Sequence, residues 1–119
     1  MENEILQLEK KLFKYEYMSN SEWLNKIIHD NFQECGKSGY LFNKNGTVNF
    51  LLECEEDRKI DIYNFRCEKI DDNTWIVNYI TTVNKDKYFR TSIWVMDNNL
   101  KLLFHQASKL NFEVELIKF

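Results

Sequence analysis

Glycine is scarce in this chain: only three glycines, Gly36, Gly39 and Gly46, occur in 119 residues. The segment Gly36-Lys37-Ser38 resembles the end of a phosphate-binding loop, but such a loop needs a further glycine five residues earlier, where Asn31 stands. A phosphate-binding loop also follows a hydrophobic strand, whereas the residues before Asn31 are predicted to be helical. These two mismatches exclude the usual nucleotide-binding loop.

Cysteine and histidine are also few. The three cysteines, Cys35, Cys54 and Cys67, are odd in number and share no C-x-x-C spacing, which indicates reduced thiols rather than a disulfide framework. Their spacing relative to His29 and His105 gives no support for a zinc site. We therefore expect no metal, no cofactor and a reducing, cytoplasmic location.

Long hydrophobic runs and blocks of one charge are missing as well. No apolar run approaches the length of a membrane-spanning helix, and the N-terminal sequence MENEILQLEKK is acidic and amphipathic, unlike a signal peptide. Sixteen basic and nineteen acidic residues give a net charge of −3, and both signs are scattered along the chain. We expect neither a nucleic-acid partner nor a membrane partner.

Large apolar side chains are abundant. Hydrophobic residues make up 44% of the chain and aromatic residues 15%, which is ample material for a core with bulky walls. A chain of 119 residues can bury a continuous core without disulfide or metal staples. We expect one ordered domain over residues 1–119.

The first part of the chain has the periodicity of amphipathic helices. Apolar residues recur at helical spacing over residues 3–18, with Glu9 among the polar residues on other faces. A second apolar run at residues 23–28 follows Ser19, which has capping-box spacing with the glutamate three residues later. The second helix is therefore expected to begin near Ser19 and to end near His29, an exposed histidine.

A short strand and a third helix are predicted next. Residues 32–36 favour a strand in which Glu34 lies on the face opposite its two neighbours. Asn43 or Asn45 can cap a helix that carries the apolar residues at 48–52.

From residue 60 onward the pattern alternates with the period of two that is typical of strands. Strands are predicted at 60–67, 75–83, 88–96 and 102–109, with an edge strand at 111–119 and turns at 71–73 and 97–99. Helices that precede a run of antiparallel strands must cover one face of the sheet, which predicts an α+β architecture.

The predicted hairpin at 88–109 carries long polar side chains among large apolar ones. Arg90, His105 and Gln106 lie on strands too hydrophobic to be free in water. At least some of them must be buried, and buried polar groups need hydrogen-bond partners.

Five segments together resemble the domain-of-unknown-function family 4440 of the SnoaL-like, nuclear transport factor 2-like superfamily. They are Leu8-Glu9, Phe32-x-Glu34-x-Gly36-x-Ser38-Gly39, Tyr79, Arg90-Thr91-Ser92-Ile93-Trp94 and Phe104-His105-Gln106. The resemblance spans residues 4–108. It departs mildly from the family pattern at Thr91, where serine is usual, and at Ala107-Ser108, where Gly-Thr is usual.

The resemblance implies a cone-shaped fold, in which N-terminal helices pack on a strongly curved, mostly antiparallel sheet and leave a cavity at the open end. Relatives in the superfamily include isomerases, dehydratases and polyketide cyclases, which place Asp, His or Tyr in the cavity for proton transfer. Others have no catalysis and use the sheet or the cavity for protein association.

The candidate site is a polar cluster in this cavity. Its catalytic candidate is His105, and its ligand-binding candidates are Glu34, Ser38, Tyr79, Arg90, Ser92, Trp94 and Gln106. In this interpretation His105 acts as a general acid or base near neutral pH, while Arg90 holds an anionic or carbonyl oxygen and Glu34 orients one of the two. In a regular strand, however, His105 and Gln106 point to opposite faces, so both can line the cavity only if a bulge intervenes.

A structural interpretation of the same residues stays open. Glu34 and Arg90 can form a buried ion pair, and His105 can bond a backbone carbonyl in the core. Two functions follow: a domain that binds a small polar or carbonyl-bearing molecule, with or without chemistry on it, or a protein-interaction module. We expect a homodimer formed through the outer face of the sheet, which includes Ile93 and Val95.

Overall fold

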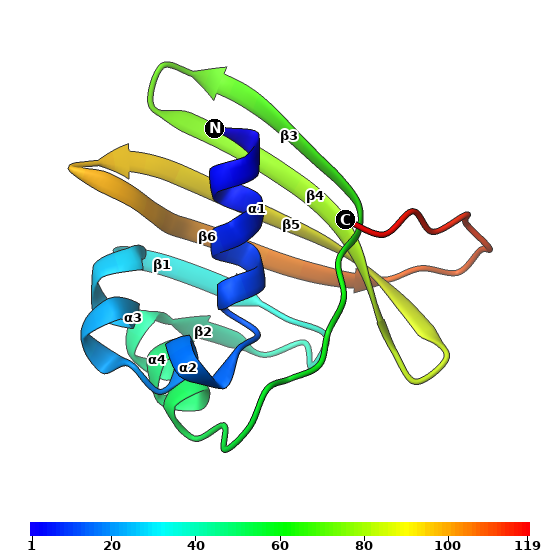
Figure 1. Ribbon diagram of the computed structural model, residues 1–119, viewed down its shortest axis with the longest axis horizontal. Helices are drawn as coiled ribbons and strands as arrows, with labels where there is room; N and C mark the ends of the chain where they lie inside the picture. The colour runs from blue at the N-terminus through cyan, green and yellow to red at the C-terminus, as the bar shows by residue number, and fades with distance from the viewer.

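A computed structural model describes all residues from 1 to 119 and has four helices and a six-stranded sheet (Figure 1). The helices are α1 (Glu2–Lys11), α2 (Tyr15–Met18), α3 (Ser21–Ile27) and α4 (Lys44–Leu52). The strands are β1 (Ile28–Cys35), β2 (Leu41–Asn43), β3 (Tyr63–Asp71), β4 (Thr74–Val83), β5 (Asp86–Asp97) and β6 (Asn99–Lys109). The predicted α+β architecture is confirmed.

The strands form a curled, unclosed sheet in the order β2-β1-β6-β5-β4-β3. Every neighbouring pair is antiparallel except β1 and β6, which run parallel. Helix α1 crosses the sheet in front of β4 and β5, while α2, α3 and α4 gather at the end formed by β1 and β2 (Figure 1). The space between these helices and the sheet holds both the core and the candidate site.

Alternation along the central strands decides which side chains enter the core. On β4, the alternate residues Trp75, Val77 and Tyr79 are buried. On β5, Arg90 and Trp94 face the same interior and are buried too, although one of them carries a charge. The pairing of β4 with β5 is regular over its whole length, so these inward-facing residues lie side by side.

The predicted single helix over residues 3–18 is wrong. The chain leaves the helix after Lys11, and Lys14 has extended backbone with φ −103° and ψ 134°. The backbone N–H of Tyr15 then donates to a carboxylate oxygen of Asp57 at 2.8 Å. This contact, 42 residues away in sequence, helps to start α2 in a new direction and could not be read from local periodicity.

The N-terminal cap of α3 is Asn20 and not the predicted Ser19, because the Asn20 side chain accepts a hydrogen bond from the backbone N–H of Trp23 at 3.0 Å. The predicted cap of the third helix is confirmed: the side chain of Asn43 accepts from the backbone N–H of Gly46 at 2.9 Å. The hairpin turn after β5 is confirmed as well, with Asn98 in the left-handed region at φ 67°.

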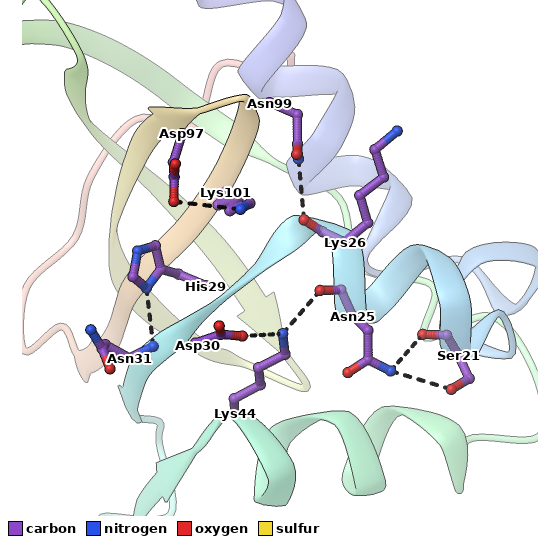
Figure 2. Close-up of polar contacts among 10 residues, drawn as sticks. All are labelled: Ser21, Asn25, Lys26, His29, Asp30, Asn31, Lys44, Asp97, Asn99 and Lys101. Carbon is purple, nitrogen blue, oxygen red and sulfur yellow. Dashed lines mark hydrogen bonds and ion pairs between the residues drawn. The ribbon is translucent and has the colours of Figure 1, made fainter.

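Figure 2 shows how the end of α3 is tied to its neighbours. The Lys44 ammonium donates to the carbonyl of Asn25 at 2.9 Å and pairs with Asp30 at 3.0 Å. The amide of Asn99, at the turn between β5 and β6, donates to the carbonyl of Lys26 at 3.1 Å. The helix ends at Ile27, close to the predicted end near His29, but His29 itself lies in β1, which starts directly after α3, and is half-buried and not exposed as predicted.

The predicted edge strand at 111–119 is wrong. Only one isolated bridge forms there, between Tyr63 and Lys118. Asn64, at φ 53°, donates its backbone N–H to the carbonyl of Ile117 at 2.8 Å. The side-chain oxygen of Asn64 accepts from the backbone N–H of Ile117 at 2.7 Å. The C-terminal segment thus fastens to the start of β3 by a few contacts. No helix of the chain combines the length and apolar character needed to cross a membrane.

Candidate functional site

A cavity of about 320 Å³ lies among the helices, the loop after β1 and the inward face of the sheet. Half of its 18 lining residues are hydrophobic. Large apolar side chains in its wall include Leu12, Phe13, Phe42, Phe50, Leu51 and Leu102. Its polar groups include Glu9, Glu34, Arg58, Tyr79, Arg90 and His105. This combination of an apolar wall with a few polar groups is typical of a site for a small molecule.

Arg90 is the charged group that β5 brings into the interior. Its side chain is buried, and its Nε donates to the hydroxyl of Thr81 at 2.7 Å. Its Nη1 lies 3.2 Å from Nε2 of His105. A guanidinium can only donate, so Nε2 of His105 must be the acceptor, and the ring proton belongs on Nδ1.

The other ring nitrogen of His105 is also engaged. Nδ1 lies 2.7 Å from the hydroxyl oxygen of Ser92, to which it donates in this tautomer. Burial, together with the positive charges of Arg90 and Arg58, lowers the pKa of His105 to about 3. The ring is therefore neutral at physiological pH, with both nitrogens occupied. This disagrees with the expectation that His105 serves as an acid or base near neutrality.

Glu9 of α1 is the buried carboxyl that the sequence interpretation placed on a polar face. One carboxylate oxygen accepts from the phenol of Tyr79 at 2.5 Å and the other from the indole N–H of Trp94 at 2.8 Å. Burial raises the pKa of Glu9, while these bonds, the Ser92 hydroxyl and the charge of Arg90 oppose the rise. Glu9 follows the buried Ile5 by four residues, a spacing on one helix face that could have revealed it.

These contacts join into what we call the polar relay, made of Arg90, His105, Ser92 and Glu9. Donors and acceptors follow one another from the guanidinium through the imidazole to the hydroxyl, which in turn lies near the carboxyl. The charge of Arg90 is thus linked to that of Glu9 through neutral groups. The two hydrogen bonds to His105 set the orientation of its ring in the wall of the cavity.

The predicted ion pair between Glu34 and Arg90 is absent. None of the eight ion pairs within 4.0 Å includes either residue. Glu34 lines the cavity, and its carboxylate accepts no hydrogen bond. Burial raises the pKa of Glu34, and the charges of Arg90 and Arg58 oppose this rise. His105 likewise bonds side chains and not the backbone carbonyl of the structural interpretation.

The other predicted site residues divide into two groups. Ser38 and Tyr79 line the cavity, whereas Ser92 and Trp94 are fully buried behind its wall. Gln106 does not line the cavity, because its side chain is exposed on the opposite side of β6 from His105. The bulge in β6 lies before Phe104, so the pairing is regular at both residues and turns only the histidine inward.

Arg58 is a site residue that the sequence interpretation missed. It lies in the loop after α4 and directly follows the acidic residues Glu55, Glu56 and Asp57. Its guanidinium lies over the rings of Phe13 and Phe50, 5.3 and 5.6 Å from their centroids. Burial and the nearby charge of Arg90 lower the pKa of Arg58.

No protein-family model matches the sequence, and no curated protein matches it. Solved structures do match. An NTF2-like protein of unknown function from Prochlorococcus marinus is 20% identical with a TM-score of 0.70, covering 93% of this chain and 94% of that one. An NTF2-like protein from Cytophaga hutchinsonii is 18% identical with a TM-score of 0.64, covering 91% and 97%. A putative ketosteroid isomerase from Parabacteroides distasonis is 10% identical with a TM-score of 0.70, covering 93% and 89%.

The chain therefore has the nuclear transport factor 2-like fold, an α+β cone with helices on a curled sheet. At these identities the likeness shows the fold alone, because one fold hosts many functions. Membership of family 4440 stays a prediction.

Proposed function

We propose that this chain is a cytoplasmic ligand-binding domain of family 4440, whose cavity takes a small molecule with an anionic or carbonyl oxygen. The observation that carries the proposal is the state of Arg90. This buried guanidinium has no carboxylate within 4.0 Å, and only its Nε and Nη1 have protein partners. The one fully buried side-chain polar atom without a partner is the hydroxyl oxygen of Thr47, so the remaining Nη2 keeps access to open space.

An oxygen of a bound molecule would supply the acceptor that Nη2 lacks. A hydrogen bond to a charged group contributes about 1.5–3 kcal/mol, and an uncompensated buried charge is costly. Arg58 places a second guanidinium in the same cavity. It too has no carboxylate within 4.0 Å. A ligand can therefore bind without breaking an existing ion pair, and binding does not require that the protein catalyse a reaction.

The proposal is tested by a thermal-shift screen of small carboxylates, ketones and amides against the wild type and Arg90→Gln. A ligand at one hundred times its Kd stabilises the fold by about 2.7 kcal/mol, which raises the Tm of a domain this size by several degrees. We expect a compound that stabilises the wild type and not the variant. If Arg90→Gln does not fold, NMR of the wild type takes the place of the comparison with the variant. The Nε–H resonance of Arg90 should then shift when the ligand binds.

The proposal is overturned if no compound stabilises the wild type. It is overturned equally if the stabilising compounds leave the Arg90 resonance unmoved or act equally on the variant.

A second candidate function is homodimerisation through the outer face of the sheet. Phe89 is 41% exposed on that face of β5, and Ile93 and Phe104 are only half-buried there. An apolar sheet face of this kind favours coverage by a second copy.

A further inference from the structure

A second hollow, of about 540 Å³, lies beside the cavity. We call it the outer hollow; its walls come from the loop at residues 54–60 and from residues 82–84 at the end of β4. Three residues border both the cavity and the outer hollow: Lys37, Arg58 and Arg90. All three are basic, so the boundary between the two spaces is cationic.

None of the three basic side chains is paired with a carboxylate. None of them takes part in the eight ion pairs of the chain. Lys37 contacts an aromatic ring instead, with its ammonium 5.7 Å from the centroid of Tyr88. Against the two carboxyls of the cavity, Glu9 and Glu34, the formal balance is three minus two, or +1.

The wall of the outer hollow carries charges of both signs. It contains four basic residues, Lys37, Arg58, Lys59 and Arg90, and three acidic ones, Glu55, Glu56 and Asp57, a formal balance of +1. Each of the two spaces thus has a formal surplus of one positive charge, which a molecule with a single negative charge at the shared boundary would offset.

The cavity side of the boundary is apolar. The guanidinium of Arg58 stacks on Phe13 and Phe50, so the charged group and the hydrophobic wall are continuous. The neighbouring wall residues, Leu12 and Leu51, extend this surface. The cavity volume of about 320 Å³ equals the volume of about ten water molecules in the liquid. A ligand that fills the cavity therefore has on the order of ten non-hydrogen atoms.

We infer that the ligand is an amphipathic monocarboxylate with a chain of about eight carbons, its carboxylate held at Arg58 and Arg90 and its chain inside the cavity. This inference rests on the proposed function and makes it specific. Lys37 at the edge of the boundary adds attraction for the entering anion.

The test is calorimetric titration of the wild type with butanoate, hexanoate and octanoate, and with octan-1-ol and octylamine as uncharged and cationic matches. Each added methylene that enters the cavity should lower the Kd about fourfold, as expected for burial of a methylene group. Octan-1-ol and octylamine should bind at least about tenfold more weakly than octanoate, since a charge-assisted hydrogen bond is lost.

Variants separate the boundary from the rest of the surface. Arg58→Met should raise the Kd for octanoate at least about tenfold, whereas Arg66→Met should leave it unchanged. Arg66 is the matched control because it lies on β3, is exposed and does not border the cavity. If Arg58→Met does not fold, weakening of octanoate binding by added salt in the wild type tests the same ion pairing.

The inference is overturned if chain length has no effect, if the alcohol binds as well as the acid, or if binding ignores both Arg58→Met and salt. Should other compounds of the screen bind in an Arg90-dependent way while octanoate does not, the proposed function stands and the ligand class is wrong. If nothing binds, both fail.

Discussion

Replacing His105 by Gln should make the protein less sensitive to acid. Gln is neutral at every pH, and its side-chain oxygen can take the place of Nε2 as the acceptor for Arg90. The relay thus keeps its link to the guanidinium, while the group that titrates is removed. The expected change is in the pH dependence of stability, apart from any constant loss caused by the substitution.

The sign follows from the direction of the pKa shift. The pKa of His105 is lowered from 6.5 to about 3 in the folded protein, so on acidification the unfolded chain binds its proton first. The stability associated with the neutral ring is complete above pH 6.5 and is lost as the pH falls toward 3. At about 1.36 kcal/mol per pKa unit, the loss between pH 7 and pH 4 is about 3 kcal/mol.

Urea unfolding of the wild type and His105→Gln at pH 7, 6, 5 and 4 measures this quantity. The free energy of unfolding of the wild type should fall by about 3 kcal/mol more than that of the variant. The carboxyls of Glu9 and Glu34, whose raised pKa values act in the opposite direction, are present in both proteins and largely cancel in the difference. Parallel curves for the wild type and His105→Gln would refute the buried, neutral ring.

Three further predictions concern other residues. Glu9→Leu should lower the free energy of unfolding by about 2–6 kcal/mol, because two buried donors lose their acceptor at about 1–3 kcal/mol each, whereas the exposed Glu4→Leu should change it little in the same urea titration. Asn98→Val should destabilise by about 1–2 kcal/mol because a β-branched residue tolerates φ 67° poorly, whereas Asn98→Gly should not, and thermal denaturation compares the two. Ile93→Lys should convert a homodimer to a monomer in size-exclusion chromatography without shifting ligand binding; an unchanged elution volume would count against the outer sheet face as the interface.

Local patterns predicted the sheet better than the helices or the site. Alternation located the strands and grouped their side chains by face, but it did not say which face is the interior one, and the structure shows that Tyr79 and Arg90 are on it. The same pattern could not show that Arg90 meets His105 and not Glu34, since the pairing of β6 with β5 brings the histidine close and Glu34 lies on β1. The partner of Arg90 depends on which strands pair in the folded sheet, and a short window of sequence does not contain this information.

The buried position of Glu9 escaped prediction for a related reason. A charged residue in an amphipathic helix is usually solvated, and only its donors on β4 and β5 make the interior acceptable to it. The break between α1 and α2 depends in the same way on Asp57, a distant residue. At the break, a tertiary contact overrode the helical pattern. At Glu9 the helical spacing was compatible with burial, and the distant donors make the burial of a carboxyl acceptable.

The contacts of Glu9 also constrain when the protein can fold during its synthesis. The donors Tyr79 and Trp94 follow it by 70 and 85 residues, so the ribosome makes the carboxyl long before it makes the groups that satisfy it. Domains are made from the N-terminus at about 5–20 residues per second, which leaves α1 waiting for several seconds. Until β5 emerges, the first helix has no interior in which its carboxyl is acceptable. Helix α1 therefore cannot reach its final place before the strands that carry its donors have been made.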